Sequence, residues 1–190
     1  MSAPVILQRP SPHCDARPAG ESISLLVIHN ISLPAGQFAS VPEHSFVDAL
    51  FRGCLDCSAK PDFASLRDVR VSAHCVIWRD GRIFQYVPFA KRAWHAGVSQ
   101  FAGRERCNDF SIGIELEGTD NLPYTEAQYQ SLIQLTELIC RQFPAITPQR
   151  ITGHSDIAPG RKTDPGIAFD WMRYRSAIIE WNNKRDQGAL

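Results

Sequence analysis

Two short apolar runs, each carrying one ionisable side chain, most constrain the fold of this chain. The first is SLLVIH at Ser24–His29, and the second is FSIGIEL at Phe110–Leu116. Runs of this length and apolar content are typical of buried strands in the interior of a sheet. His29 is then expected where its strand ends, at the mouth of the sheet.

A hairpin and two helices are expected around these strands. Val71–Trp78 and Arg82–Val87 flank an Asp-Gly pair, which is typical of a tight β-hairpin turn. Thr125–Phe143 begins with a capping-box pattern and carries apolar residues on one helical face. Asp170 can cap a closing helix with apolar residues at helical spacing. We therefore predict a mixed α/β fold, a central mixed β-sheet flanked by helices.

The length of 190 residues suits one domain with a substantial core, so we predict a single domain over residues 1–190. The Pro-rich opening is interpreted as an irregular leader to that fold. Residues 30–70 are interpreted as a long, partly irregular excursion with a short helix at Ser45–Phe51.

Charge and composition argue against several classes of partner. Twenty basic residues balance twenty acidic ones, which gives no electrostatic reason to expect binding to nucleic acid or to an anionic membrane. No export signal or membrane-spanning apolar run is visible, so we expect a cytoplasmic location, with a monomer as the default.

The six scattered cysteines are interpreted as reduced thiols. Cys54 and Cys57 form a CxxC without a second pair, which favours an ordinary loop over a zinc site.

The stretch TGHSDIAPGRKTDPG, Thr152–Gly166, concentrates ionisable side chains on one loop. His154 and Asp164 could supply two metal ligands, and His29 a third, which leaves a fourth position open as in catalytic zinc sites. Lys162 fits such a site if negative charge develops there during a reaction. Spacing alone leaves the alternative open that each is an ordinary surface or loop residue.

The strand FSIGIELEG offers a group for proton transfer. Alternation places Glu115 and Glu117 on the same face, so periodicity cannot choose between them. Glu117 adjoins Gly118 and Thr119 and is expected to be the more solvated of the two. A carboxyl group nearer the interior is the better candidate for a raised pKa, which mildly favours Glu115.

Five motifs, in order, resemble the zinc-dependent N-acetylmuramoyl-L-alanine amidases, a group that includes phage T7 lysozyme and the peptidoglycan recognition proteins. Within this group the chain looks like the cytoplasmic 1,6-anhydro-N-acetylmuramyl-L-alanine amidases of Gram-negative bacteria. The motifs are LLVIHNISLP, VSAHCVIWRDG, QYVPFAKRAWHAGVSQF, GRERCNDFSIGIELEGTD and TGHSDIAPGRKTDPG. The match covers about residues 24–175, which we take as the catalytic core.

The resemblance implies one Zn²⁺ and a set of roles for individual residues. It implies zinc ligands at His29, His154 and Asp164, with Glu115 as general base and Lys162 as the group that stabilises the transition state. It also implies substrate contacts, which we assign to Asn30, Arg70, His95 and Arg106, although a framework role for His95 is equally compatible.

The implied substrate is an anhydromuropeptide, cleaved at the amide between the lactyl group of 1,6-anhydro-N-acetylmuramic acid and L-alanine. In some bacteria this step of peptidoglycan recycling removes the muropeptides that induce the AmpC β-lactamase. Two alternatives remain: a noncatalytic peptidoglycan-binding module on the same fold, and an amidase acting on intact cell wall. The first is disfavoured because all five implied active-site residues are present, and the second because no wall-binding module or basic surface is visible.

Overall fold

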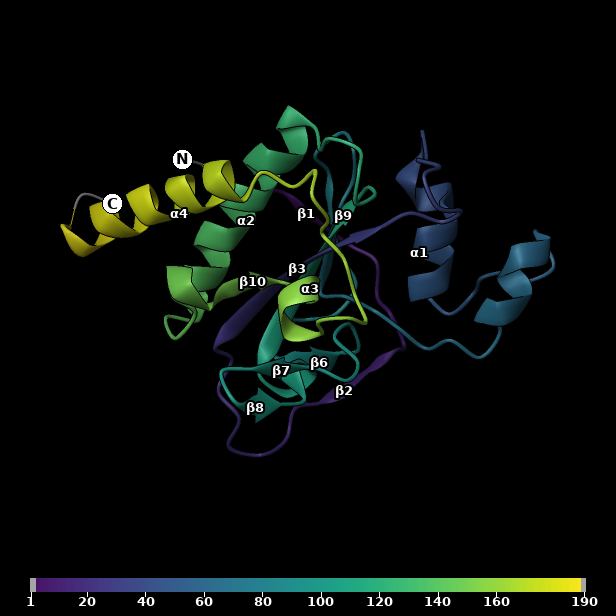
Figure 1. Cartoon of the computed structure of the whole chain (residues 1–190). Helices are drawn as coiled ribbons and strands as arrows, with labels where there is room; N and C mark the ends of the chain where they lie inside the picture. The colour runs from purple at the N-terminus through teal and green to yellow at the C-terminus, as the bar shows by residue number, and fades with distance from the viewer. Residues whose placement is uncertain (1–2, 189–190) are drawn as a thin grey trace.

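A six-stranded mixed sheet organises the computed structural model, which describes residues 3–188 (Figure 1). Along the sheet the strands follow the order β1 (Ile6–Gln8), β5 (Ile83–Gln85), β4 (Cys75–Ile77), β9 (Ser111–Glu117), β3 (Leu25–Ile31) and β10 (Ile151–Gly153). Neighbouring strands are parallel except β4 and β5, which pair antiparallel. The predicted central mixed sheet is therefore confirmed.

The remaining elements are short strands and helices around this sheet. Two antiparallel pairs lie outside it: β2 (Cys14–Ala16) with β6 (Lys91–Ala93), and β7 (Gln100–Phe101) with β8 (Arg104–Glu105). The helices are α1 (Phe46–Phe51), α2 (Glu126–Gln142), α3 (His154–Ile157) and α4 (Trp171–Asp186). Four 3₁₀ turns are η1 (Pro42–His44), η2 (Pro61–Leu66), η3 (Cys107–Asp109) and η4 (Pro148–Arg150).

Helices α2 and α4 cover one face of the sheet (Figure 1). The predicted capping box starts α2: the Thr125 hydroxyl accepts from the Gln128 amide, and the Gln128 side chain accepts from the Thr125 amide. Asp170 caps α4 by accepting from the Arg173 amide. The apolar faces of both helices pack on Leu26 and the other inward residues of the sheet, which forms the largest buried core. Both helix predictions are confirmed.

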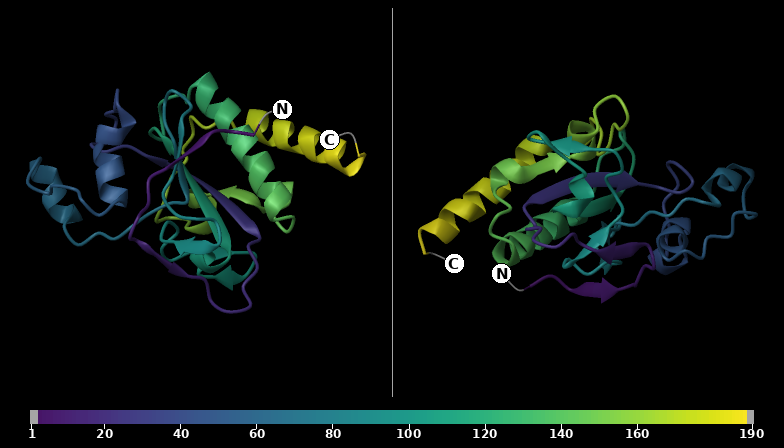
Figure 2. Two further views of the ribbon diagram at one scale, coloured as in Figure 1. Left: turned by 180° about the vertical axis from the view of Figure 1, so that it is seen from behind. Right: turned by 90° about the horizontal axis from the view of Figure 1, so that it is seen from below.

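The opposite face carries two smaller apolar clusters with a polar space between them. One cluster joins α1 to β4 and β5, and the other joins Leu25 and Val27 to Phe110 and Ile157. Figure 2 shows α1 on the side of the molecule away from α4. The chemistry-bearing side chains of β3 and β9 project from this second face.

Two expectations about the leader and the hairpin need correction or adjustment. The Pro-rich opening is not irregular throughout, because Ile6–Gln8 forms the edge strand β1 and pairs with β5. The hairpin around Asp80-Gly81 is confirmed, with strands shorter than the sequence indicated. None of the helices in the described part of the chain combines the length and apolar composition needed to cross a bilayer.

Candidate metal centre and active site

The register of three parallel strands brings the candidate residues to one place. His29 on β3 pairs with Glu115 on β9, and both side chains leave the same face of the sheet. On the other side of β3, Gly153 of β10 pairs with Ile28, so His154 begins one residue beyond the paired segment. The carboxyl ends of parallel strands meet at one edge of a sheet, and there His29, Glu115 and His154 come together.

Backbone hydrogen bonds fold the loop after β10 back onto the sheet. The Asp156 carboxylate accepts from the Gly153 amide and the Thr152 hydroxyl at the start of α3. The Ser155 amide then donates to the Asp164 carbonyl at 2.9 Å, which brings position 164 beside the start of that helix. The predicted loop thus contains one helical turn, and its closure carries Asp164 to His154.

Three potential ligand atoms converge on one point. His29 Nδ1 lies 2.9 Å from His154 Nδ1 and 3.1 Å from Asp164 Oδ2, and the last two atoms are 3.0 Å apart. Each imidazole nitrogen has one lone pair or one proton in its ring plane, so these three contacts cannot all be hydrogen bonds. A cation at the shared point satisfies all three. Ligand atoms of a tetrahedral zinc with bonds of about 2.1 Å lie about 3.4 Å apart, close to these separations.

The protonation of these groups also suits a metal. Burial lowers the pKa of His29 to about 4, so its ring is neutral near pH 7. His154 Nε2 lies 3.1 Å from the Ala96 carbonyl, which accepts its proton and leaves Nδ1 as the lone-pair atom. For Asp164, burial opposes ionisation, but the proximity of the His154 and His29 rings outweighs it and lowers the pKa of the carboxyl group. Two neutral histidines and a carboxylate form a donor set that fits zinc.

Glu115 is a buried carboxyl group with unused hydrogen-bonding capacity. Its side chain is 8% exposed, and its Oε2 atom is buried without a hydrogen-bond partner among residues 3–188. Burial, and then the nearby Asp164 carboxylate, raise the pKa of Glu115 well above its ordinary value. A buried acceptor without a partner costs free energy unless a ligand or water satisfies it.

The expected contrast in solvation between the two glutamates is wrong. Glu117 is only 2% exposed, because loops from elsewhere in the chain cover it. Its carboxylate accepts from the Ala39 amide at 2.9 Å and from the Arg79 amide at 3.3 Å. The two glutamates therefore differ in their hydrogen bonds. Backbone amides donate to the Glu117 carboxylate, whereas no backbone amide donates to that of Glu115 among the described residues.

A groove of about 570 Å³ opens beside the convergent atoms. Lys162, Asp164 and Asn30 line it. The exposed Lys162 side chain is close enough for its charge to lower the pKa values of both His29 and Glu115. Asn30 donates to the Asp120 carboxylate at 2.8 Å, which holds the amide at the groove wall.

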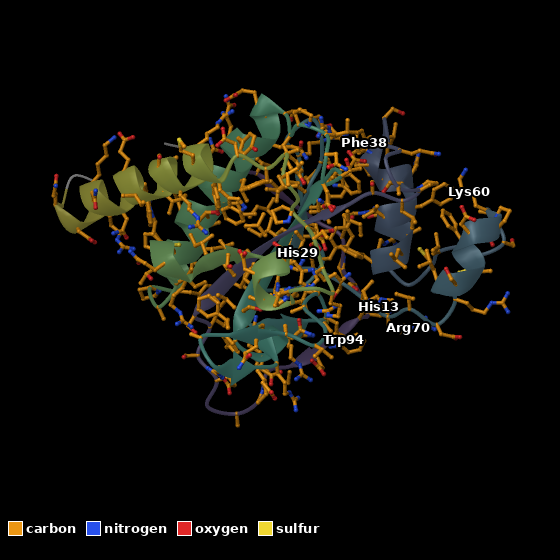
Figure 3. The ribbon with its side chains drawn as sticks, in the orientation of Figure 1. His13, His29, Phe38, Lys60, Arg70 and Trp94 are labelled. Atoms are coloured by element: carbon orange, nitrogen blue, oxygen red, sulfur yellow. The ribbon has the colours of Figure 1, made fainter. Side chains whose placement is uncertain are left out.

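The other predicted substrate contacts lie away from this groove. Arg106 lines a second groove with Arg161 and has an ion pair with Asp109. Arg70 is exposed, donates to the carbonyls of Arg67 and Val69, and lies apart from His29 (Figure 3). His95 is buried and contacts His29. The substrate roles of all three residues stay predictions.

Two residues that the sequence interpretation passed over belong to this region. Asp120 lines the groove and holds Asn30, although the only signal was its place in a polar turn after β9. Ser111 lies behind the site and contacts His95 Nε2 at 3.1 Å. Alternation along the strand does predict that Ser111 shares a face with Glu115, but it gives Ser111 no role.

Comparison with known proteins identifies the family. Residues 19–167 match the profile of a family described as N-acetylmuramoyl-L-alanine amidase. The chain belongs to this amidase family. Its curated relatives include the 1,6-anhydro-N-acetylmuramyl-L-alanine amidases AmpD of Citrobacter freundii and Escherichia coli. The first is 59% identical over 92% of this chain and 91% of the relative. The second is 62% identical over 89% and 90%.

Solved structures of the amidase family share the fold. A selenomethionine derivative of AmpD superposes with a TM-score of 0.86 at 60% identity, covering 91% of this chain and 94% of that one. The amidase AmiD from E. coli superposes with a TM-score of 0.60 at 32% identity, covering 85% of this chain and 60% of AmiD. That structure is a complex with the substrate anhydro-N-acetylmuramic acid-L-Ala-D-γ-Glu-L-Lys.

Proposed function

We propose that this protein is a zinc-dependent amidase that hydrolyses anhydromuropeptides at the amide between the lactyl group of 1,6-anhydro-N-acetylmuramic acid and L-alanine. The observation that carries the proposal is the convergence of His29, His154 and Asp164 beside the unpartnered carboxyl oxygen of Glu115. The names of the AmpD relatives and the substrate in the AmiD complex support this choice of bond and sugar.

His29, His154 and Asp164 would hold one zinc ion. When bound, the ion supplies a Lewis acid next to the scissile carbonyl. His29 is neutral and Asp164 is ionised, so the carboxylate supplies one negative charge that compensates the charge of the ion. Lys162, on the groove wall, adds a second positive charge where negative charge develops on the carbonyl oxygen.

Glu115 would move the proton. Its raised pKa makes the carboxyl group a good match for proton transfer near neutral pH, and its free Oε2 atom can accept from an attacking water. The same oxygen would then return the proton to the departing alanine nitrogen. Glu117 is unsuited to this role because two backbone amides already occupy its carboxylate.

The groove beside the site would receive the substrate. Asn30, fixed by Asp120, offers an amide hydrogen-bonding group on its wall and is our first candidate for a substrate contact. Arg106 and Arg161 line the neighbouring groove and could meet a carboxylate of the peptide. Arg70 would contact substrate only if the segment before β4 approaches the groove.

We further propose that the protein works as a monomer on recycled wall fragments in the cytoplasm. All six cysteines are free, including the exposed Cys54, which is compatible with a reducing compartment. Cell fractionation tests the location, and size-exclusion chromatography with light scattering tests the oligomeric state. Detection of the protein only outside the cytoplasmic fraction, or only as a dimer, would contradict these two points.

A direct assay tests the activity. The zinc-loaded protein is incubated with an anhydromuropeptide, and mass spectrometry follows release of the intact peptide. Parallel reactions contain the chelated protein, the Glu115→Gln variant, or intact cell wall as substrate. Cleavage of the anhydromuropeptide only by the zinc-loaded wild type is expected. Binding without cleavage would indicate the noncatalytic module, and faster cleavage of intact wall would indicate a wall amidase.

A further inference from the structure

The His95 ring lies directly behind the His29 ring, on the side away from the convergent ligand atoms. His29 Nε2 and His95 Nδ1 are 2.9 Å apart, and the two rings meet edge-on with an interplanar angle of 86°. On its far side, His95 Nε2 lies 3.1 Å from the Ser111 hydroxyl. Both histidines and Ser111 are buried, so water does not compete for these contacts.

The direction of this hydrogen-bond chain decides whether His29 can bind a metal. A free lone pair on Nδ1 requires the His29 proton to sit on Nε2, from which it donates to His95 Nδ1. The His95 proton then sits on Nε2 and is accepted by the Ser111 hydroxyl. The opposite direction would place a proton on His29 Nδ1 and block the metal.

We propose that His95 is a positioning residue that holds the His29 ring in the orientation and tautomer required of a metal ligand. The proposal rests on the proposed function, since it assigns the outer partner of a ligand in that same zinc site. Outer partners of this kind raise the basicity of the ligand nitrogen and reduce the freedom of the ring.

The neighbouring Ala96 does the same for the other histidine. Its carbonyl oxygen accepts from His154 Nε2 at 3.1 Å, so two consecutive residues orient both histidine ligands. The Asn108 side-chain oxygen accepts from the His95 and Ala96 amides, at 3.1 and 2.8 Å, and anchors this dipeptide. One backbone segment therefore sets both rings relative to each other.

Strand β9 provides the space for the His95 ring. A Cβ atom at Gly113 would lie 2.5 Å from both Cγ and Nδ1 of His95, well inside contact distance. Only glycine at this position leaves room for the ring beside the strand. The side chain of His95 is 9% exposed and does not line the groove, which separates this role from substrate contact.

Zinc affinity tests the proposal without relying on turnover. Competition with a chromophoric chelator gives the zinc Kd of the wild type, His95→Leu and His95→Asn. His95→Leu removes the acceptor for His29 Nε2 and should weaken zinc binding about 10- to 100-fold. Asparagine keeps an acceptor oxygen near the position of Nδ1, so His95→Asn should recover most of that loss.

Gly113→Ala gives an independent test, because the added methyl group displaces the His95 ring without removing any polar group. It should weaken zinc binding at least about 10-fold. Gly81→Ala is the control: its Cβ would also crowd its surroundings, at 3.0 Å from Cβ and from the carbonyl oxygen of Ala127, but neither residue lines the groove or belongs to the convergent cluster. Circular dichroism of each metal-free variant reports folding, and Gly113→Ala decides the question if His95→Leu does not fold.

Specific outcomes would overturn the inference. The first is a wild-type zinc Kd in folded His95→Leu. The second is equal weakening of zinc binding in His95→Leu and His95→Asn, and the third is equal weakening in Gly113→Ala and Gly81→Ala. Each of these leaves the proposed function intact, because the wild type still binds zinc. A wild type that binds no zinc would instead overturn the proposed function, and this inference with it.

Discussion

His29 and Glu115 occupy paired positions on the adjacent parallel strands β3 and β9. The His29 ring, whose Nδ1 atom converges with two other potential ligands, therefore shares one face of the sheet with the buried Glu115 carboxyl group, whose pKa is raised. Backbone register between two buried strands fixes this relationship. Lys162 and Asp164 reach the same place from a loop, whose closure depends on a few backbone hydrogen bonds.

Glu115→Gln is expected to abolish most activity while zinc binding is retained. The amide preserves the size of the side chain but cannot accept and return a proton, so kcat should fall by about 100- to 10,000-fold. Initial rates with an anhydromuropeptide and metal analysis of the same preparation check both parts. Loss of zinc together with activity would point to a ligand role for Glu115.

Glu117→Gln provides the opposite pattern. Glutamine can offer only one acceptor oxygen to the two amides that Glu117 now satisfies, so the free energy of unfolding should fall by about 1–3 kcal/mol. The kcat of the folded variant should stay within a few-fold of the wild-type value, because this carboxylate is not free to take a proton. An inactive Glu117→Gln beside an active Glu115→Gln would reverse the assignment of the base.

Removal of the metal should lower the thermal stability of the protein. A ligand that binds only the folded state at about 1,000 times its Kd contributes about 4 kcal/mol. Melting curves with zinc and with a chelator should therefore differ for the wild type and coincide for His154→Ala. His44→Ala is the matched control, since this exposed histidine lies outside the convergent cluster. A wild-type Tm that is the same with zinc and with the chelator would argue against a metal bound to the folded state.

The elements predicted correctly from the sequence are those whose signals are local. The capping box of α2 and the Asp-Gly hairpin each depend on residues that are close together in the sequence, and both are confirmed. The edge strand β1 was missed because its three residues, two of them exposed, carry no strand pattern of their own. They pair with β5, more than 70 residues away. Such pairings depend on tertiary context and not on propensity.

In the candidate site, too, the features with local signals were predictable and those that depend on tertiary contacts were not. Alternation placed Glu115 and Glu117 on one face, as the register has them. The burial of Glu117 depends on loops at Ala39 and Arg79, which no local pattern links to it. The convergence of His29 with His154 joins positions 125 residues apart, so spacing alone could not predict it, whereas a resemblance across several motifs could.

Lys162→Ala should lower kcat without weakening zinc binding. The ammonium group is expected to stabilise negative charge that is present only in the transition state, and loss of one such donor costs about 100- to 1,000-fold in kcat. Removing a positive charge from the groove cannot weaken a cation site by electrostatics, so the zinc Kd should be unchanged or lower. Lys184→Ala, on the exposed face of α4, controls for general effects of losing a lysine. A weaker zinc Kd in Lys162→Ala would indicate that the lysine shapes the loop instead.

The buried His74 should make the metal-free protein less stable as the pH falls below about 6.5. Burial, and then the charge of Arg17, lower the pKa of His74 to about 3, while the unfolded chain binds this proton near 6.5. Between these values the unfolded state holds more protons than the folded state, so the free energy of unfolding decreases as pH decreases. For one such histidine the loss between pH 7 and pH 5 is about 2 kcal/mol.

Urea unfolding of the metal-free wild type and His74→Gln at both pH values isolates this contribution. Glutamine can replace the acceptor for the Gly113 amide and the donor to the Lys91 carbonyl, but it does not titrate. The variant should be less stable at pH 7, and the gap to the wild type should shrink by about 2 kcal/mol at pH 5. His29 and His95 are present in both proteins, so the comparison subtracts their own proton uptake and leaves the contribution of His74 together with its coupling to them. Parallel losses of stability in the two proteins would mean that His74 takes up its proton in the folded state, and that its burial does not exclude charge.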